Sequence, residues 1–387
     1  MLILKNGKVL TMAGPEFVGD VAIENGKIAA VGENLSFEGA LVCDVSGAYV
    51  MPGIIDAHSH IGMWEDSMGW EGADGNESTD PVTPQLRAID SINPYDVNFK
   101  EACAAGVTTC VTGPGSANVI GGTFVAMKTA GDSVEDMTLR FPVAMKAAFG
   151  ENPKSVYGQS GKAPKTRMAT AAIMRKALVD AQEYGRKIDE AKGDAEKMPA
   201  RDLGKEALLR VIRREIPMKI HAHRADDILT AIRIAKEFNI RYTLDHCTEG
   251  WLITDHLKKA LQEGCEGIII GPLFTERSKI ELKNLSYKAP KALYDAGIKF
   301  AMITDHPVIP QHYLSVCIAL AVREGLPEEE ALRAITVNAA EITGIADRVG
   351  SLEVGKDADI AVFSGHPLDF RARCLMTLIG GKVVHEA

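Results

Sequence analysis

Eight short apolar runs of strand character recur along the middle of the chain, separated by longer stretches with the apolar spacing of helices. The runs are Ile54–Ile55, Val107–Val111, Phe124–Met127, Phe141–Met145, Met218–Ile220, Ile240–Leu244, Gly267–Ile270 and Phe300–Ile303. Buried strands that alternate with helices predict a parallel sheet, and eight strands is the number that closes such a sheet into a barrel. We therefore expect an α/β fold with a (β/α)8, TIM-like barrel over residues 51–347.

The two ends of the chain share a different pattern, in which short alternating strands are separated by tight turns. Asn6-Gly7 and Asn25-Gly26 stand between such strands near the start, and Asn-Gly favours the turn of a β-hairpin. Residues 348–387 show similar strand-like runs around Gly380-Gly381. Because neither end is long enough to enclose a core alone, we expect residues 1–50 and 348–387 to form one small β-sandwich domain.

Composition and charge narrow the class of partner. The 387 residues carry 43 Lys and Arg against 52 Asp and Glu, a formal charge of −9. A net acidic chain without a basic run argues against a nucleic-acid groove, and no stretch reaches the roughly 18 apolar residues of a membrane helix. The start lacks the pattern of a secretory leader, and the cysteines form no Cys-x-x-Cys pair. We expect a cytoplasmic protein that acts on a small molecule, without a nucleic-acid or membrane partner.

Histidines and one aspartate gather just after the predicted barrel strands. They are His58 and His60 after the first strand, His221 and His223 after the fifth, His246 after the sixth and Asp305 after the eighth. The carboxyl ends of barrel strands share one face, and side chains two residues apart on a strand point to the same side. Imidazole and carboxylate groups are the ligands of a catalytic zinc-type site. The pattern favours a divalent metal centre over isolated core histidines that are hydrogen-bonded to backbone.

The segment Pro52–His60 resembles the P-G-x-x-D-x-H-x-H opening of the amidohydrolase superfamily, and His221, His246 and Asp305 follow in the order of that family. The runs Thr336–Ala340 and Gly350–Ile360 resemble its return into a small β domain. Within the superfamily the chain looks most similar to imidazolonepropionase-related and prolidase-like members. The resemblance implies one or two divalent ions, with zinc expected, and a homo-oligomer.

The resemblance also raises the question of a ligand from the fourth strand, where binuclear members carry a carboxylated lysine. Lys146 lies in an otherwise apolar run, and a buried lysine loses its charge readily, which lets the neutral amine capture carbon dioxide. We expect Lys146 to be a metal ligand. Glu151 is the competing residue, because some members use a glutamate there, and a Lys146 side chain that reaches a carboxylate is the structural alternative.

These residues predict metal-dependent hydrolysis of a C–N bond in an amide, cyclic amide or peptide-like substrate, by a metal-activated hydroxide. The resemblance assigns His58, His60, Lys146, His221, His246 and Asp305 to the metal. Asp305 is expected to shuttle the proton, and His223 to contact the substrate or support a ligand. Two alternatives stay open: a heterocycle deaminase with one metal ion, and a non-catalytic relative that uses the barrel for binding or assembly.

Overall fold

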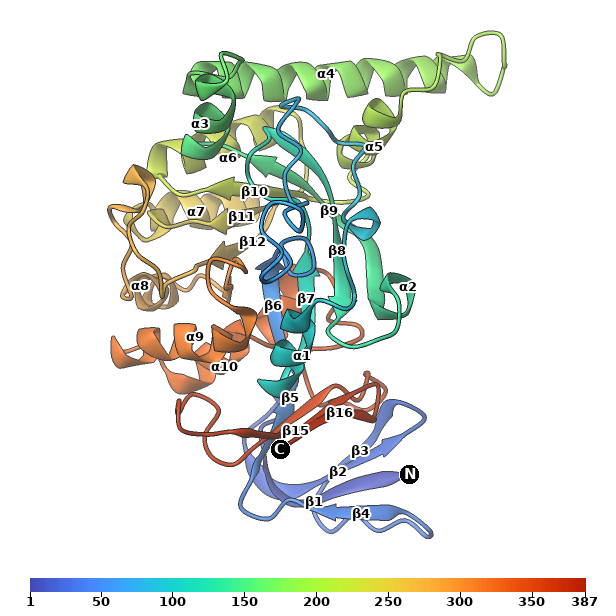
Figure 1. The fold of residues 1–387 in the computed structure, drawn as a ribbon, viewed down its shortest axis with the longest axis vertical. Helices are drawn as coiled ribbons and strands as arrows, with labels where there is room; N and C mark the ends of the chain where they lie inside the picture. Colours follow the sequence, from blue (N-terminus) through green and yellow to red (C-terminus); the bar gives the residue numbers. More distant parts are fainter.

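The computed structural model describes residues 1–387 and contains two eight-stranded sheets, one forming a barrel and the other a small sheet that holds both chain termini (Figure 1). The barrel strands follow one another in chain order around the sheet. They are β6 (Ile54–Ser59), β7 (Val107–Thr112), β8 (Ile120–Lys128), β9 (Thr138–Ala148), β10 (Met218–Ala222), β11 (Tyr242–His246), β12 (Cys265–Ile270) and β13 (Phe300–Met302). All eight predicted runs are strands, and the TIM-like barrel is confirmed.

One strand runs in the direction opposite to the prediction. β8 is antiparallel to both β7 and β9, whereas the remaining neighbours in the barrel sheet pair in parallel. The expectation of eight parallel strands is therefore wrong for β8. The physical reason lies in the connections: residues 113–119 contain no helix and are too few for the crossover of a dozen or more residues that a parallel neighbour needs. Antiparallel strands require only a short loop.

Helices follow most of the barrel strands, and most of these helices pack on the outside of the barrel. They are α1 (Val97–Ala104), α2 (Val134–Met137), α3 (Glu151–Gln159), α4 (Arg167–Ala191), α5 (Leu203–Ile212), α6 (Ala225–Glu237), α7 (Thr254–Gln262), α8 (Ala289–Asp295), α9 (Leu314–Arg323), α10 (Glu328–Ala334) and α11 (Val337–Ile342). Short 3-10 turns are η1 (Ala88–Asp90), η2 (Gly250–Leu252), η3 (Ile280–Leu282) and η4 (Gln311–Tyr313). None of these helices combines the length and apolar character needed to cross a membrane.

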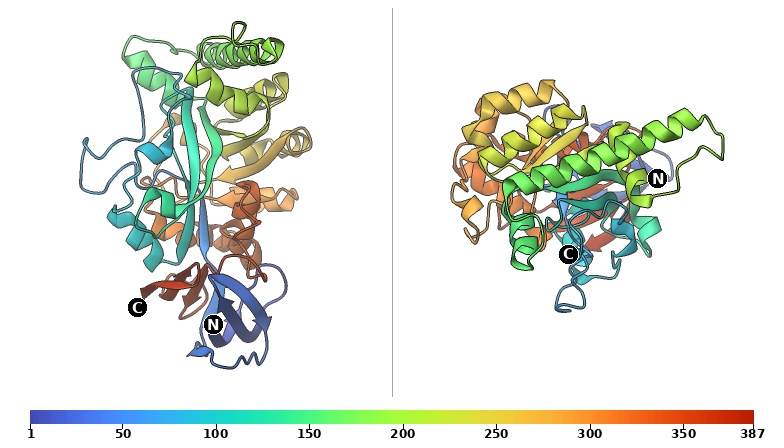
Figure 2. Two further views of the ribbon diagram at one scale, coloured as in Figure 1. Left: turned by 90° about the vertical axis from the view of Figure 1, so that its right-hand side faces the viewer. Right: turned by 90° about the horizontal axis from the view of Figure 1, so that it is seen from above.

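The longest helix, α4, lies at the end of the molecule remote from the small sheet (Figures 1 and 2). It begins where the Thr166 side chain accepts a hydrogen bond from the backbone N–H of Ala169, which satisfies one of the free donors of the first turn. It ends at Lys192, whose left-handed conformation stops the helix. Its buried residues face α5 and α6, while its charged residues face solvent, as expected of a solvated helix face.

The small sheet is built from both ends of the chain. Its strands are β1 (Leu2–Val9), β2 (Phe17–Glu24), β3 (Lys27–Gly32), β4 (Leu41–Asp44), β5 (Tyr49–Pro52), β14 (Ile360–Phe363), β15 (Cys374–Ile379) and β16 (Lys382–Glu386). β5 joins the two halves, since it pairs with β1 on one side and β14 on the other. A core that includes Leu4, Val21, Val50, Ile360 and Leu378 lies within this unit. The pairing of the two termini is confirmed, and the domain boundaries at 50/51 and 347/348 stay a prediction.

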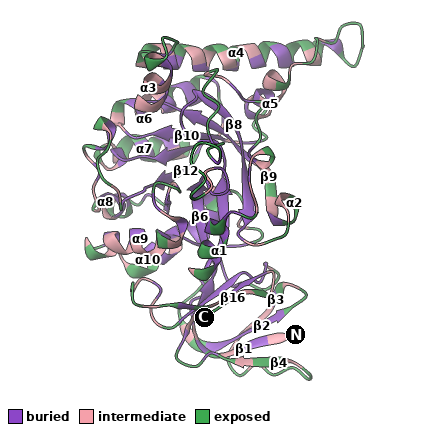
Figure 3. Ribbon diagram, viewed as in Figure 1, coloured by how far each residue is buried: buried purple, intermediate pink, exposed green.

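A second core fills the inside of the barrel. It joins inward residues such as Ile55, Phe124, Ile269 and Ile303 with Ile342 of α11, which contacts β6, β12 and β13. The barrel strands are almost entirely buried (Figure 3). One end of the barrel interior is therefore packed with apolar side chains, which leaves the carboxyl ends of the strands as the place where polar side chains meet.

Candidate metal centre

Strand alternation brings polar side chains into the barrel from β10. Met218, Ile220 and Ala222 belong to the apolar core outside the barrel, so the residues between them point inward. These are Lys219, His221 and, just beyond the strand, His223, and all three are buried. The same alternation explains why polar residues occupy every second position along this apolar strand and at the residue just beyond it.

Two of the predicted site residues owe their orientation to an unusual backbone. His246 and Asp305 have φ values of 68° and 54°, a left-handed conformation that costs a residue with a Cβ atom about 1–2 kcal/mol. Each stands at or just after the end of a strand, where Asp245 precedes His246 and Thr304 precedes Asp305. Strained backbone of this kind is concentrated at functional sites because surrounding structure must hold it in place.

Three imidazoles surround one oxygen of Asp305. The Oδ1 atom lies 3.1 Å from Nε2 of His60, 3.7 Å from Nε2 of His58 and 3.9 Å from Nε2 of His246. His58, His246 and Asp305 form a group whose ligand atoms all lie within 4.8 Å of one another. The residues come from β6, β11 and the end of β13, so the structure brings together what the sequence separates by more than two hundred positions.

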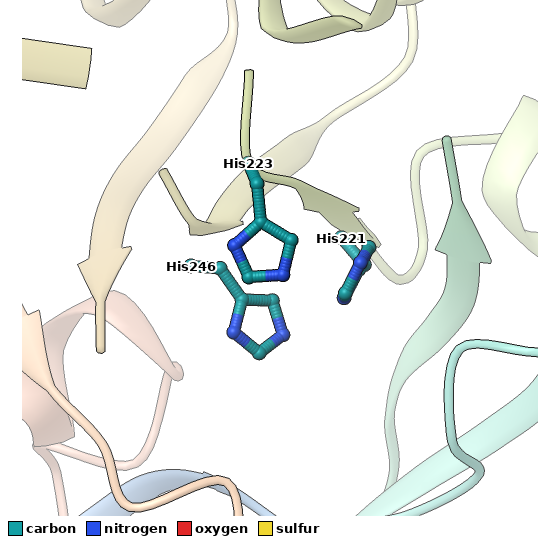
Figure 4. A group of neighbouring side chains, drawn as sticks. All are labelled: His221, His223 and His246. Carbon is teal, nitrogen blue, oxygen red and sulfur yellow. The ribbon is translucent and has the colours of Figure 1, made fainter. Parts of the chain in front are cut away.

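A second group of imidazoles adjoins the first. The ligand atoms of His221, His223 and His246 also lie within 4.8 Å of one another, and the three rings face one space (Figure 4). The ring centroids of His221 and His246 are 4.4 Å apart, and those of His221 and His223 are 4.6 Å apart. His246 belongs to both groups, so the two groups form one continuous centre.

Contacts on the far side of the rings determine which nitrogen faces the centre. Nδ1 of His60 donates to the carbonyl of Gly113 at 2.6 Å, and Nδ1 of His246 donates to the carbonyl of Gly271 at 2.9 Å. Nδ1 of His58 donates to the Asp245 carboxylate. Because these acceptors have no proton to give, the hydrogen of each neutral ring sits on Nδ1 and the lone pair sits on Nε2, toward the centre.

Electrostatics keep the imidazoles neutral and the carboxylate charged. Burial lowers the pKa of His58, His221 and His246 well below the ordinary value, and it lowers the pKa of His223 to about 4. Burial alone would raise the pKa of Asp305, but the side chains of His246, His60 and Lys146 around it hold that pKa well below its usual range. Neutral imidazole and ionised carboxylate are the forms that bind a metal ion.

Two buried lysines lie side by side beneath the imidazoles, since Lys146 of β9 pairs with Lys219 of β10 in the sheet register. Lys219 forms an ion pair with Asp245 at 2.7 Å. Lys146 has no carboxylate within ion-pair distance; its Nζ atom lies 3.3 Å from Nε2 of His58. Burial lowers the pKa of Lys146 to about 8, so a neutral amine is accessible near neutral pH. The structure thus places Lys146 among the predicted ligands, without the carboxylate contact considered as its alternative.

Glu151, the competing candidate for a ligand from the fourth barrel strand, lies apart from the imidazoles. Its Oε2 atom accepts a hydrogen bond from the backbone N–H of Glu281 at 3.4 Å, and no hydrogen bond or ion pair joins it to a histidine. Instead Glu281, from η3, places a carboxylate oxygen 3.8 Å from Nε2 of His221 and 3.7 Å from Nε2 of His223.

Sequence reasoning missed Glu281, Asp245 and Lys219. The last two carried a signal, because each stands two residues from an inward-facing polar residue on its own strand: His221 for Lys219 and Thr243 for Asp245. Glu281 carried only the general signal that loops after barrel strands form active sites, since it lies within the connection between β12 and α8.

The donor set suits a divalent metal ion. Nε2 of His246 is buried and has no hydrogen-bond partner, and the same is true of one oxygen of Glu281. Buried polar atoms without partners are rare in proteins, and a metal ion bound between these two would satisfy both. Several neutral nitrogen donors and two carboxylates within one space are the ligands that zinc and similar ions take.

Comparisons with known proteins identify the family. The model of the Amidohydrolase family matches residues 49–384, and the chain belongs to this family. An amidohydrolase from Thermotoga maritima of known crystal structure is 42% identical, with a TM-score of 0.97 and complete coverage of both chains. The resemblance of the Pro52–His60 motif to the amidohydrolase superfamily is thereby confirmed, and members of this family are metal-dependent hydrolases of C–N bonds.

Curated relatives are more distant and longer. Amidohydrolase tasK of Hapsidospora irregularis is 29% identical over 395 residues, covering 94% of this chain and 40% of that protein. An adenine deaminase of Bacillus velezensis is 24% identical over 391 residues, covering 99% of this chain and 57% of that protein. The chain spans about half the length of these curated relatives. A prolidase structure with bound N-methylphosphonate-L-proline, 18% identical with a TM-score of 0.62, shares the fold.

Proposed function

We propose that this chain is a metal-dependent hydrolase that cleaves a C–N bond in an amide, cyclic amide or peptide-like substrate. The observation that carries the proposal is the buried convergence of three Nε2 atoms, from His58, His60 and His246, on Oδ1 of Asp305. Membership of the Amidohydrolase family supports it, because His58 and His60 lie in the Pro52–His60 segment that resembles the opening motif of that superfamily.

One or two ions would be held by His58, His60, His221, His246 and Asp305, with Lys146 as a further candidate ligand after carboxylation. When bound, a divalent ion of the zinc type activates water as a nucleophile and polarises the carbon that is attacked. Lys146 would suit the role of a ligand because it is buried, lies 3.3 Å from Nε2 of His58, and has no carboxylate partner that would keep it protonated.

Asp305 would move the proton. Its carboxylate is ionised and lies among the imidazoles, with Oδ1 3.1 Å from Nε2 of His60, so it can accept the proton that the attacking water loses. The same oxygen would then give this proton to the nitrogen that leaves as the C–N bond breaks. His223 lies beside His221 and His246, and its Nδ1 contacts Thr248 Oγ1 at 2.7 Å, which holds the ring where it would contact the substrate.

Deamination of a heterocycle is the second candidate. Adenine deaminases of Bacillus velezensis and Listeria monocytogenes are 24% and 25% identical over more than nine tenths of this chain. A deaminase attacks a ring C=N carbon and releases ammonia, so it needs the same proton movement through Asp305. The two candidates differ in their products. Hydrolysis of an amide or peptide-like bond releases an amine, hydrolysis of a cyclic amide opens its ring, and deamination releases ammonia.

A substrate panel with the Asp305→Asn variant tests the proposal. Purified protein loaded with zinc is screened against dipeptides, N-acyl amino acids, lactams, hydantoins and aminopurines, and amine and ammonia release are measured separately. We expect turnover on one class and a loss of about 10²–10⁴-fold in kcat for Asp305→Asn, the range of general acid–base catalysis. Near-wild-type turnover by this variant would contradict the role of Asp305, and ammonia release from an aminopurine alone would favour the deaminase.

A further inference from the structure

Glu281 is a buried carboxylate with no Lys or Arg side chain within ion-pair distance. Its residue is 1% exposed, and its only ion-pair contacts are to His221 and His223. The Oε1 atom has no hydrogen-bond partner. A buried carboxylate oxygen without a partner is energetically unfavourable, so a group held in this state points to a cation or donor that binds there.

The structure is built to hold Glu281 in this position. Oε2 accepts a hydrogen bond from the backbone N–H of Glu151 at 2.9 Å, and the backbone N–H of Glu281 donates to the Glu151 carboxylate at 3.4 Å. These reciprocal contacts fasten the loop after β12 to the start of α3. The second oxygen, Oε1, is thereby left to face the imidazoles.

Gly150 makes room for the carboxylate. Its φ is +87°, and a Cβ atom at this position would lie 2.7 Å from Oε2 of Glu281 and 3.2 Å from Oδ2 of Asp227. Only glycine accommodates both the left-handed backbone and the approach of two carboxylates. The backbone at Gly150 therefore leaves space for the Glu281 carboxylate, and this space does not depend on the contact between Glu281 and the histidines.

The spacing of the donor atoms matches a metal site. Oε1 of Glu281 lies 3.8 Å from Nε2 of His221 and 3.7 Å from Nε2 of His223, both too long for hydrogen bonds. Two ligand atoms bound to one tetrahedral zinc ion at about 2.0–2.2 Å lie roughly 3.4 Å apart. The distance between Oδ1 of Asp305 and Nε2 of His58 is similar, at 3.7 Å.

We propose that Glu281 is a metal ligand and forms, with His221 and His223, the binding set for a divalent ion of the zinc type. The set is distinct from the one around Asp305, and His246 lies between the two. The inference rests on the proposed metal-dependent function and extends it, because it makes a carboxylate from the loop after β12 part of the centre. His223 becomes a ligand rather than a residue that contacts only substrate.

Zinc binding by the metal-free protein tests this directly. The wild type, Glu281→Gln and Glu276→Gln are stripped with a chelator and titrated with Zn²⁺ against a chromogenic competitor, and bound zinc is counted by elemental analysis after dialysis. Glu276→Gln is the matched control, because Glu276 belongs to the same connection between β12 and α8 but is exposed to solvent. We expect Glu281→Gln to hold one ion fewer per chain or to bind it about 100-fold more weakly, since loss of a partner of a ligand already costs 10–100-fold.

The outcomes separate this inference from the proposed function. Equal stoichiometry and affinity, within about two-fold, for Glu281→Gln and the wild type would overturn the Glu281 assignment while leaving the Asp305 set in place. Absence of zinc from the wild type would contradict the proposed function and this inference together. Circular dichroism of the metal-free variants checks folding; if Glu281→Gln does not fold, Glu281→Asp, which keeps the charge but is one methylene shorter, is expected to weaken zinc binding by at least about ten-fold.

Discussion

At the scale of single residues, we expect substitution within the buried ion pair of Lys219 and Asp245 to have a large effect on the free energy of unfolding. Both side chains are at most 3% exposed, and Asp245 also accepts a hydrogen bond from His58. Lys219→Met would leave the Asp245 charge without its cation in the barrel interior. We expect a loss of roughly 3–5 kcal/mol in the free energy of unfolding, measured by urea denaturation of the metal-free protein.

An exposed pair of the same chemistry provides the control for this variant. Lys299 and Glu341 form an ion pair at 2.5 Å, with side chains 54% and 40% exposed. Lys299→Met is expected to change the free energy of unfolding by less than about 1 kcal/mol, because water already screens such pairs. Similar losses for the two variants would show that Lys219 is not needed to neutralise Asp245.

The sequence predicts most of the candidate ligands but not the residues that orient them. His58, His60, His221 and His246 are recognisable because they stand at strand ends, where the barrel geometry requires convergence. Glu281 has no such marker, since its place depends on how a loop folds back onto Glu151. Long-range contacts of loops are not encoded in periodicity, which is why this carboxylate appears only in the structure.

At the scale of elements, the positions of the strands are predictable and their directions are not. An apolar run such as Phe124–Met127 looks the same whichever way the strand points, because both faces of a barrel strand are buried. The length of the connection decides the direction. The loop at residues 113–119 is short and has no helical period, and this is the local signal that β8 turns back on β7.

The contact between β12 and α11 yields a prediction at this scale. A Cβ atom on Gly267 would lie 2.5 Å from Cγ2 and 2.6 Å from Cγ1 of Ile342. Gly267→Ala is therefore expected to lower the free energy of unfolding by about 1–3 kcal/mol through overpacking. Ile342→Ala opens this space, so the double variant should be no less stable than Ile342→Ala alone, and additive losses in urea denaturation would rule out the steric explanation.

At the scale of the whole molecule, one carboxylate ties the small sheet to the barrel. Asp357 accepts hydrogen bonds from Lys27 of β3 at 2.5 Å, from Lys128 of β8 at 3.1 Å and from Arg348 at 2.7 Å. Lys128 also contacts Asp359, next to β14. The relative placement of the two parts thus depends on charged groups as well as on apolar contacts.

This cluster predicts a particular sensitivity to acid. Burial alone would raise the pKa of Asp357, but hydrogen bonds from Arg348, Lys27 and Lys128 hold it well below the ordinary value of 3.8. A carboxylate with a lowered folded-state pKa adds stability that is complete above the unfolded-state pKa and is lost as the pH falls toward the folded-state value. We expect Asp357→Asn to cost about 3 kcal/mol near neutral pH and progressively less below about pH 4.

Denaturation of both proteins across a pH series measures this difference. Asp347→Asn is the control, because Asp347 pairs with Arg140 at the surface, where it is 62% exposed, and should show little effect at any pH. A cost for Asp357→Asn that stays constant down to pH 2 would contradict the proposed role of its charge.

Side chains from separate barrel strands are proposed to hold a divalent ion, and the metal content of the protein tests this proposal. Elemental analysis is carried out on the zinc-loaded and dialysed wild type and on the His58→Ala/His60→Ala double variant. We expect at least one tightly held ion per wild-type chain and loss of an ion from the double variant, whose two imidazoles both contribute to the set around Asp305. Equal metal content in the two proteins would show that these histidines hold no ion.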